Sequence, residues 1–184
     1  GAIQDYQRGI IIGQKTFGKG TVQKLDNLSS GQIKITESKF YRITGAGMQS
    51  KGIHPDITLP STWDIEEIGE SSYDTALPWD EIKPVRFKKF SMGPTLISKL
   101  NDEHLTRVDQ SPNLQYILDI RKRYEIQKNK EVISLNLTNR RVEKEERQSW
   151  ALDIENKRRA SLNLETFNSY KAMQDYNDTK ETGD

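Results

Sequence analysis

Cysteine is missing from this chain of 184 residues, which excludes disulfides, thiol catalysis and cysteine-ligated metal sites. Histidine is scarce: His54 and His104 lie far apart in unlike contexts, so the sequence predicts no metal site. Long apolar runs are missing too. Because a membrane-spanning helix needs about 18 or more consecutive apolar residues, we expect no membrane span in this chain.

Charge of one sign is also lacking, because 28 lysines and arginines nearly balance 27 aspartates and glutamates. The formal net charge of +1 gives no basic field that would indicate nucleic-acid binding. Hydrophobic residues make up 33% of the sequence and charged residues 30%. A chain of this size and composition can form one moderate core or two small ones.

The most informative segment present is a glycine-flanked lysine near the N-terminus. Residues 13–23 read GQKTFGKGTVQ and follow the apolar run GIII at 9–12. A lysine held between a buried strand and a tight turn can lose its hydration, which disfavours the charged ammonium. A neutral amine can act as a general base, so Lys19 is a candidate base for a serine–lysine pair. Gln23 follows at a spacing from which its amide oxygen could accept a hydrogen bond from that amine.

Two other interpretations of this segment compete with a catalytic base. Gly13, Gly18 and Lys19 fit the G-x-x-x-x-G-K part of a phosphate-binding loop, but Gly20 stands where that loop needs serine or threonine. The loop must also open a helix, whereas residues 21–25 have a strand pattern. The second alternative is an ordinary turn with a solvated lysine, since lysine is usually a surface residue.

The motif TFGKGTVQ at 16–23 resembles the catalytic-lysine motif of the tail-specific, or C-terminal-processing, serine proteases. The resemblance covers nearly the whole chain, and its later segments are similar to the larger, Gram-negative periplasmic branch of that family. Those further segments are AIQDY with Arg8 at 2–8, KFYRITG at 39–45, KGI and PDI at 51–57, EIGE at 67–70, ALPWD at 76–80, His104 and ISLN at 133–136.

This resemblance implies roles for particular residues and no metal or cofactor. Lys19 would be the general base, Gln23 would orient it, and Phe17 would form an apolar wall that excludes water. Asp5 matches a carboxylate near the family's active site, although pairing with Arg8 at a helix end explains it equally well. The matching nucleophilic serine, the oxyanion-hole donors and the PDZ domain would all lie upstream of this chain. We therefore expect the isolated chain to be inactive.

The predicted fold class is α+β. Residues 1–60 would be the C-terminal part of an α/β protease core, and 61–92 a polar linker that lies on this core, with Trp63 and Trp79 as anchors. Residues 93–176 would form a mainly helical domain, followed by a disordered tail at 177–184.

Within the predicted core, we expect a helix end at 1–8, strands at 9–13 and 20–25, a half-buried strand at 33–43 and an edge segment at 53–59. In the helical domain, the pattern predicts helices that start at Pro94 and at Ser111-Pro112, and a long charged helix at 139–160. Alternating apolar residues at 131–137 predict a short strand.

The resemblance implies a serine endopeptidase that cuts envelope proteins after recognising their apolar C-terminal tails. Its partners would be protein substrates of this kind and an envelope adaptor protein, and its location would be the periplasm. The alternative is a non-catalytic interaction module that holds adaptor or substrate proteins and merely carries Lys19.

Overall fold

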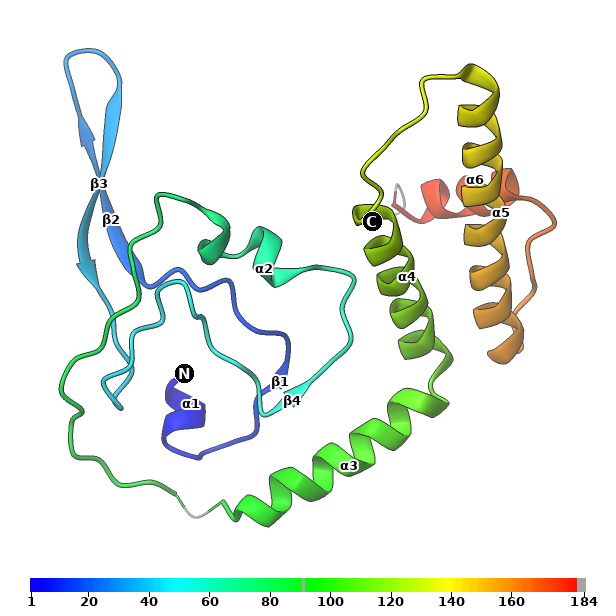
Figure 1. Ribbon diagram of the computed structural model, residues 1–184. Helices are drawn as coiled ribbons and strands as arrows, with labels where there is room; N and C mark the ends of the chain where they lie inside the picture. The colour runs from blue at the N-terminus through cyan, green and yellow to red at the C-terminus, as the bar shows by residue number, and fades with distance from the viewer. Residues whose placement is uncertain (91, 182–184) are drawn as a thin grey trace. The chain divides into compact units, whose positions relative to one another are not determined.

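Short strands and one hairpin build the first part of the chain, and helices build the rest (Figure 1). The structure is a computed structural model that describes residues 1–90 and 92–181. The chain divides into two compact units, residues 1–106 and a second unit that begins at Arg107. Helix α3 (Pro94–Gln110) runs across this boundary, and each unit is described by itself.

The first unit is organised around a two-stranded parallel pair. Strand β1 (Ile12–Gly13) pairs with β4 (Ile57–Thr58), and helix α1 (Ala2–Asp5) precedes β1. Ile57 is only 2% exposed, which places the centre of this small core on β4. The predicted strand at 9–13 and edge segment at 53–59 are therefore present, but each is only two residues long.

Strands β2 (Thr21–Asn27) and β3 (Gln32–Lys39) form an antiparallel hairpin. Gly31 has φ +89°, a conformation that glycine adopts without strain at a tight turn. The side chains of β3 are largely exposed, and Ile35 remains 46% exposed. The expectation of a half-buried strand is wrong for this chain, because none of its elements besides β2 is paired with β3 in the described residues.

Residues 60–90 contain two short helical turns, α2 (Ile65–Ile68) and the 3-10 helix η1 (Glu70–Ser72). Trp79 is anchored as expected, since its indole N–H donates to the Gly47 carbonyl at 2.8 Å. Trp63 is not, because it is largely exposed. The buried His104, in the second half of α3, lies 3.1 Å from the carbonyl oxygen of Thr58, so this part of the helix contacts the strand pair.

Three helices form the second unit beyond the end of α3: α4 (Pro112–Lys128), α5 (Leu137–Ser161) and α6 (Tyr170–Glu181). Ser111 caps α4 by accepting from the Leu114 N–H, as the Ser-Pro signal predicts. The predicted strand at 131–137 is wrong. Asn136 instead caps α5, and its side-chain oxygen accepts from the backbone of Thr138 at 2.9 Å.

A disordered tail is predicted at 177–184. Residues 177–181 continue helix α6, while 182–184 lie outside the described residues. Met173 of α6 is buried, so the helix has an apolar anchor in the second unit.

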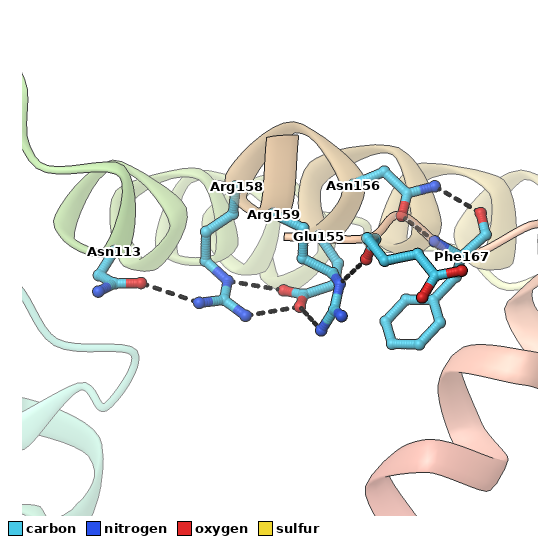
Figure 2. Close-up of polar contacts among 7 residues, drawn as sticks. Asn113, Glu155, Asn156, Arg158, Arg159 and Phe167 are labelled. Carbon is cyan, nitrogen blue, oxygen red and sulfur yellow. Dashed lines mark hydrogen bonds and ion pairs between the residues drawn. The ribbon is translucent and has the colours of Figure 1, made fainter. Parts of the chain in front are cut away.

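A buried polar cluster links the helices of the second unit (Figure 2). Glu155 on α5 accepts two hydrogen bonds from Arg158, at 2.6 and 2.8 Å, and Arg158 also donates to Asn113 of α4 at 2.9 Å. Arg159 lies over the Phe167 ring at 4.3 Å, and the Asn156 side chain holds the Phe167 backbone. Charged side chains thus contribute to the packing of these helices, whose apolar residues are sparse.

The α+β fold class is confirmed: strands are confined to the first unit, and the second unit is helical within the described residues. No helix in the described part of the chain has the length and apolar character needed to cross a membrane.

Candidate active site

The turn that carries Lys19 is pressed against residues 49–52. The Ser50 N–H donates to the Gly18 carbonyl at 2.8 Å. Gly18 has φ +91°, and a Cβ at Gly20 would lie 2.5 Å from the backbone nitrogen of Gln49. Glycine is therefore required on both sides of the lysine, once for conformation and once for close approach. The backbone at Lys19 is therefore fixed by contacts of the turn itself, independently of any contact that the lysine side chain makes.

The Lys19 amine has two polar neighbours. Its Nζ donates to Thr21 Oγ1 at 3.1 Å and lies 3.8 Å from Glu70 Oε1. The side chain faces a cavity of about 390 Å³ and is 43% exposed. The expected exclusion of water around this amine is thus not seen in this chain, because the cavity is open to solvent. Phe17 lines the same cavity, at the wall position predicted for it.

Gln23 also lines this cavity, but it does not bond to Lys19 in the described structure. Its side-chain nitrogen donates to Thr36 Oγ1 across the hairpin at 3.3 Å. The strand pairing shifts register between Val22 and Gln23. Such a bulge disturbs the regular alternation of side chains on which the predicted Lys19–Gln23 contact depended. The two residues are neighbours around one cavity without being hydrogen-bonded partners.

Asp5 is buried at the end of α1 and pairs with Arg42. The Arg42 Nε–H donates to Asp5 Oδ2 at 3.0 Å, and its terminal nitrogen contacts the other carboxylate oxygen. The partner suggested by sequence, Arg8, instead lies over the Phe90 ring. Asp5 does not line the cavity in front of Lys19. In this chain its described contacts are those of a structural ion pair.

Two residues at the site escaped sequence reasoning, Gln49 and Glu70. Gln49 is only 1% exposed; its side-chain oxygen accepts from the Gly20 N–H at 2.8 Å, and its nitrogen donates to Glu70 Oε1 at 2.9 Å. Both lie far from Lys19 in sequence, so no local spacing indicated them. The available signals were Glu70 in the EIGE segment of the family resemblance and the polar Gln49 inside the glycine-rich segment 45–52, where a buried amide is expected to have backbone partners.

The structure argues against the phosphate-loop interpretation. A phosphate-binding loop places its glycines before a helix N-terminus. Here the residues after Gly20 form strand β2. The backbone at Gly20 lies so close to Gln49 that a Cβ would not fit, which accounts for the glycine at that position. The turn positions an amine beside a carboxylate and a hydroxyl.

Comparison with known proteins shows the family of this chain. The family described as "C-terminal domain of tail specific protease" matches residues 63–184, and peptidase family S41 matches residues 1–59. The chain therefore belongs to the tail-specific proteases of peptidase family S41.

Several curated relatives are similar to it. A tail-specific protease of Haemophilus influenzae is 36% identical over 154 residues, which cover 77% of this chain and 22% of the relative. A carboxy-terminal-processing protease of Bartonella bacilliformis is 42% identical over 60 residues, 32% of this chain and 14% of the relative. A probable CtpA-like serine protease of Staphylococcus epidermidis is 43% identical over 60 residues, covering 32% of this chain and 12% of the relative. The chain thus spans about a fifth, or less, of the length of these proteins.

Proposed function

We propose that this chain supplies the general base and the helical C-terminal part of a serine endopeptidase that cleaves proteins after recognising an apolar C-terminal tail. The observation that supports this proposal is the placement of Lys19. A turn that tolerates only glycine on either side holds its amine toward a cavity, beside Glu70 and Thr21. A solvated surface lysine needs no such fixed backbone.

In the proposed reaction, the neutral Lys19 amine takes the proton of a serine hydroxyl as the oxygen attacks the scissile carbonyl. The ammonium then returns this proton to the leaving amine. Closure of the cavity in the complete enzyme would supply the desolvation that keeps the amine neutral. In this proposal the serine belongs to another segment of the full-length protease.

Substitution of Lys19 tests the base in a full-length protease that carries this chain. Lys19→Ala should lower kcat by at least about 10³-fold, because general-base catalysis is worth about 10²–10⁴-fold and acts together with the nucleophile. Lys19→Arg should be equally inactive, since an arginine keeps the charge but does not give up its proton.

The chain offers a matched control. Lys15, which precedes Lys19 in the same non-helical segment, also pairs with a glutamate, with its Nζ 2.6 Å from Glu66 Oε1. Lys15→Ala should therefore cleave like the wild type. Turnover that survives in Lys19→Ala, measured with an apolar-tailed reporter protein, would reject the assignment of the base.

The proposed setting is the periplasm, with envelope proteins as substrates and an envelope adaptor as a partner. The proposal rests on the resemblance to the Gram-negative branch and on the membership of the family. Fractionation of cells that express the full-length protein, with cytoplasmic and periplasmic markers, tests it. Recovery with the cytoplasmic marker alone would refute the location.

A non-catalytic holding role for this chain is favoured by one feature of the second unit. A groove of about 640 Å³ between α4 and α5 combines apolar and basic lining residues, among them Ile126, Ile133, Arg123 and Arg140. Such a surface would fit an acidic segment with apolar side chains. Fluorescence anisotropy of a labelled acidic, apolar-tailed peptide with this chain should then show binding without cleavage. If Arg140→Glu leaves the affinity unchanged, the groove is not the holding site.

A further inference from the structure

The buried pair Gln49 and Glu70 is built around the lysine turn. Glu70 is only 9% exposed, and its backbone N–H donates to the Phe17 carbonyl at 2.8 Å. Its carboxylate is held by the Gln49 side-chain N–H at 2.9 Å. The same Gln49 amide accepts from the Gly20 N–H at 2.8 Å. The pair thus contacts the turn on both sides of Lys19.

Both members are costly to bury unless they have partners. Gln49 satisfies both ends of its amide, one on the lysine turn and one on Glu70. That leaves the Glu70 carboxylate facing the amine of Lys19 at 3.8 Å. The other titratable side chains that line this cavity are Lys34 and Tyr73. Glu70 is the one carboxylate among the cavity's lining residues.

We propose that Gln49 and Glu70 are positioning residues for Lys19: Gln49 fixes the turn and the carboxylate, and Glu70 sets the direction of the amine. This inference rests on the proposed role of Lys19 as the base. During turnover the proton would pass from the serine hydroxyl to Lys19 Nζ and on to the leaving amine. Glu70 lies beside this amine and would hold its direction through both steps.

The substitution Glu70→Gln distinguishes a positioning role of this carboxylate from a purely structural one. In the full-length protease, kcat should fall about tenfold while KM changes less than twofold, because the amine loses the carboxylate that holds its direction. Glu66→Gln is the matched control, since Glu66 pairs with Lys15 and does not line the cavity.

Gln49→Met tests the other half of the pair, because methionine keeps the length and volume but neither hydrogen bond. It should lower kcat about tenfold at constant KM. Gln49→Glu should not restore this loss, because its carboxylate would replace the N–H that holds Glu70 and would repel the Glu70 carboxylate. Circular dichroism and thermal unfolding establish that each variant is folded. If Gln49→Met does not fold, Glu70→Gln alone decides.

A second measurement keeps this inference separable from the proposed function. In the 184-residue chain, NMR relaxation of the Lys19 side-chain carbon next to the amine measures how well ordered that carbon is. Its order should fall in Glu70→Gln and stay unchanged in Glu66→Gln. If Lys19→Ala is inactive but Glu70→Gln matches the wild type in both kinetics and NMR order, the pair is refuted and the base stands. If Lys19→Ala remains active, the base is refuted, and unchanged NMR order would then refute the pair as well.

Discussion

At the scale of single residues, Asp5 shows how a side chain linked to catalysis by family resemblance can have a structural role in the fold. Its carboxylate is buried and receives two contacts from Arg42, a residue 37 positions away in the sequence. A buried carboxylate without a partner carries a large desolvation cost. The ion pair therefore ties α1 to the segment that follows β3.

Arg42→Met should destabilise the chain by about 2–4 kcal/mol, because it leaves the Asp5 carboxylate buried and unpaired. The free energy of unfolding in urea measures this effect. Lys24→Met is the matched control: Lys24 pairs with Asp26 at 3.0 Å, but both side chains are exposed. An exposed pair contributes little, so the control should unfold like the wild type. Equal effects of the two substitutions would contradict the structural role of Asp5.

Glu143 offers a pH-dependent prediction at the same scale. The hydrogen bond from Lys130 lowers the pKa of the Glu143 carboxyl, and Arg140 adds to this effect. A carboxyl whose pKa is lowered by folding stabilises the protein above its unfolded pKa. That contribution is lost as pH falls through the lower folded value. In an NMR titration, Lys130→Ala should raise the Glu143 pKa toward its ordinary value. Lys144→Ala, adjacent on α5, should leave it unchanged, since neighbouring residues on a helix do not face each other.

Residue roles could be predicted only where the contacts are local. The glycines beside Lys19 were visible in the sequence, and the structure gives each a physical reason. The contact between Gln49 and Glu70 joins two segments that approach only after the chain has folded. No spacing in the sequence encodes it. The same limit explains why Arg8 was expected as the partner of Asp5, which instead pairs with Arg42.

At the scale of elements, helix boundaries were predictable because their signals lie within one turn. Ser111-Pro112 starts α4 where expected. The strand predicted at 131–137 failed because strand formation depends on a neighbour that local signals do not reveal. Alternating apolar residues favour a strand, but a strand needs a neighbour to receive its hydrogen bonds. None pairs with this segment in the described structure, and the cap at Asn136 starts α5 at Leu137 instead.

The polar cluster in Figure 2 leads us to expect that loss of the Arg159 side chain weakens the helical unit. Arg159 is nearly buried, lies over Phe167 and Tyr176, and donates to the Glu165 carbonyl. Arg159→Met should cost about 2–4 kcal/mol, because it removes the cation from this buried network while it keeps most of the stem. Urea unfolding followed by tryptophan fluorescence measures the cost.

The control for this change is Arg141→Met, on the exposed surface of the same helix. It should change the free energy of unfolding by less than about 0.5 kcal/mol. Hydrogen exchange should also accelerate in α6 of Arg159→Met and not in the control. Unchanged protection of α6 would show that Arg159 does not anchor that helix.

At the scale of the whole molecule, the small apolar core is the property that the sequence indicated most directly. With 33% hydrophobic residues, the chain buries Ile53, Ile57 and Met173 but exposes isoleucines along the hairpin. Composition limits how much can be buried, but it does not say which apolar residues are chosen. Ile35 and Ile57 both lie in strands, and only pairing and packing distinguish them.

The same substitution at these two positions tests that distinction. Ile57 is 2% exposed and Ile35 is 46% exposed. Ile57→Thr should destabilise the chain by about 2–3 kcal/mol, because it removes buried methyl surface and buries a hydroxyl. Ile35→Thr should change stability by less than about 0.5 kcal/mol, since its side chain is already half in water. Urea unfolding of both variants gives the comparison. A loss above 1 kcal/mol for Ile35→Thr would mean that the hairpin face is covered in solution, and a copy of the chain or another segment would then have to be sought on it.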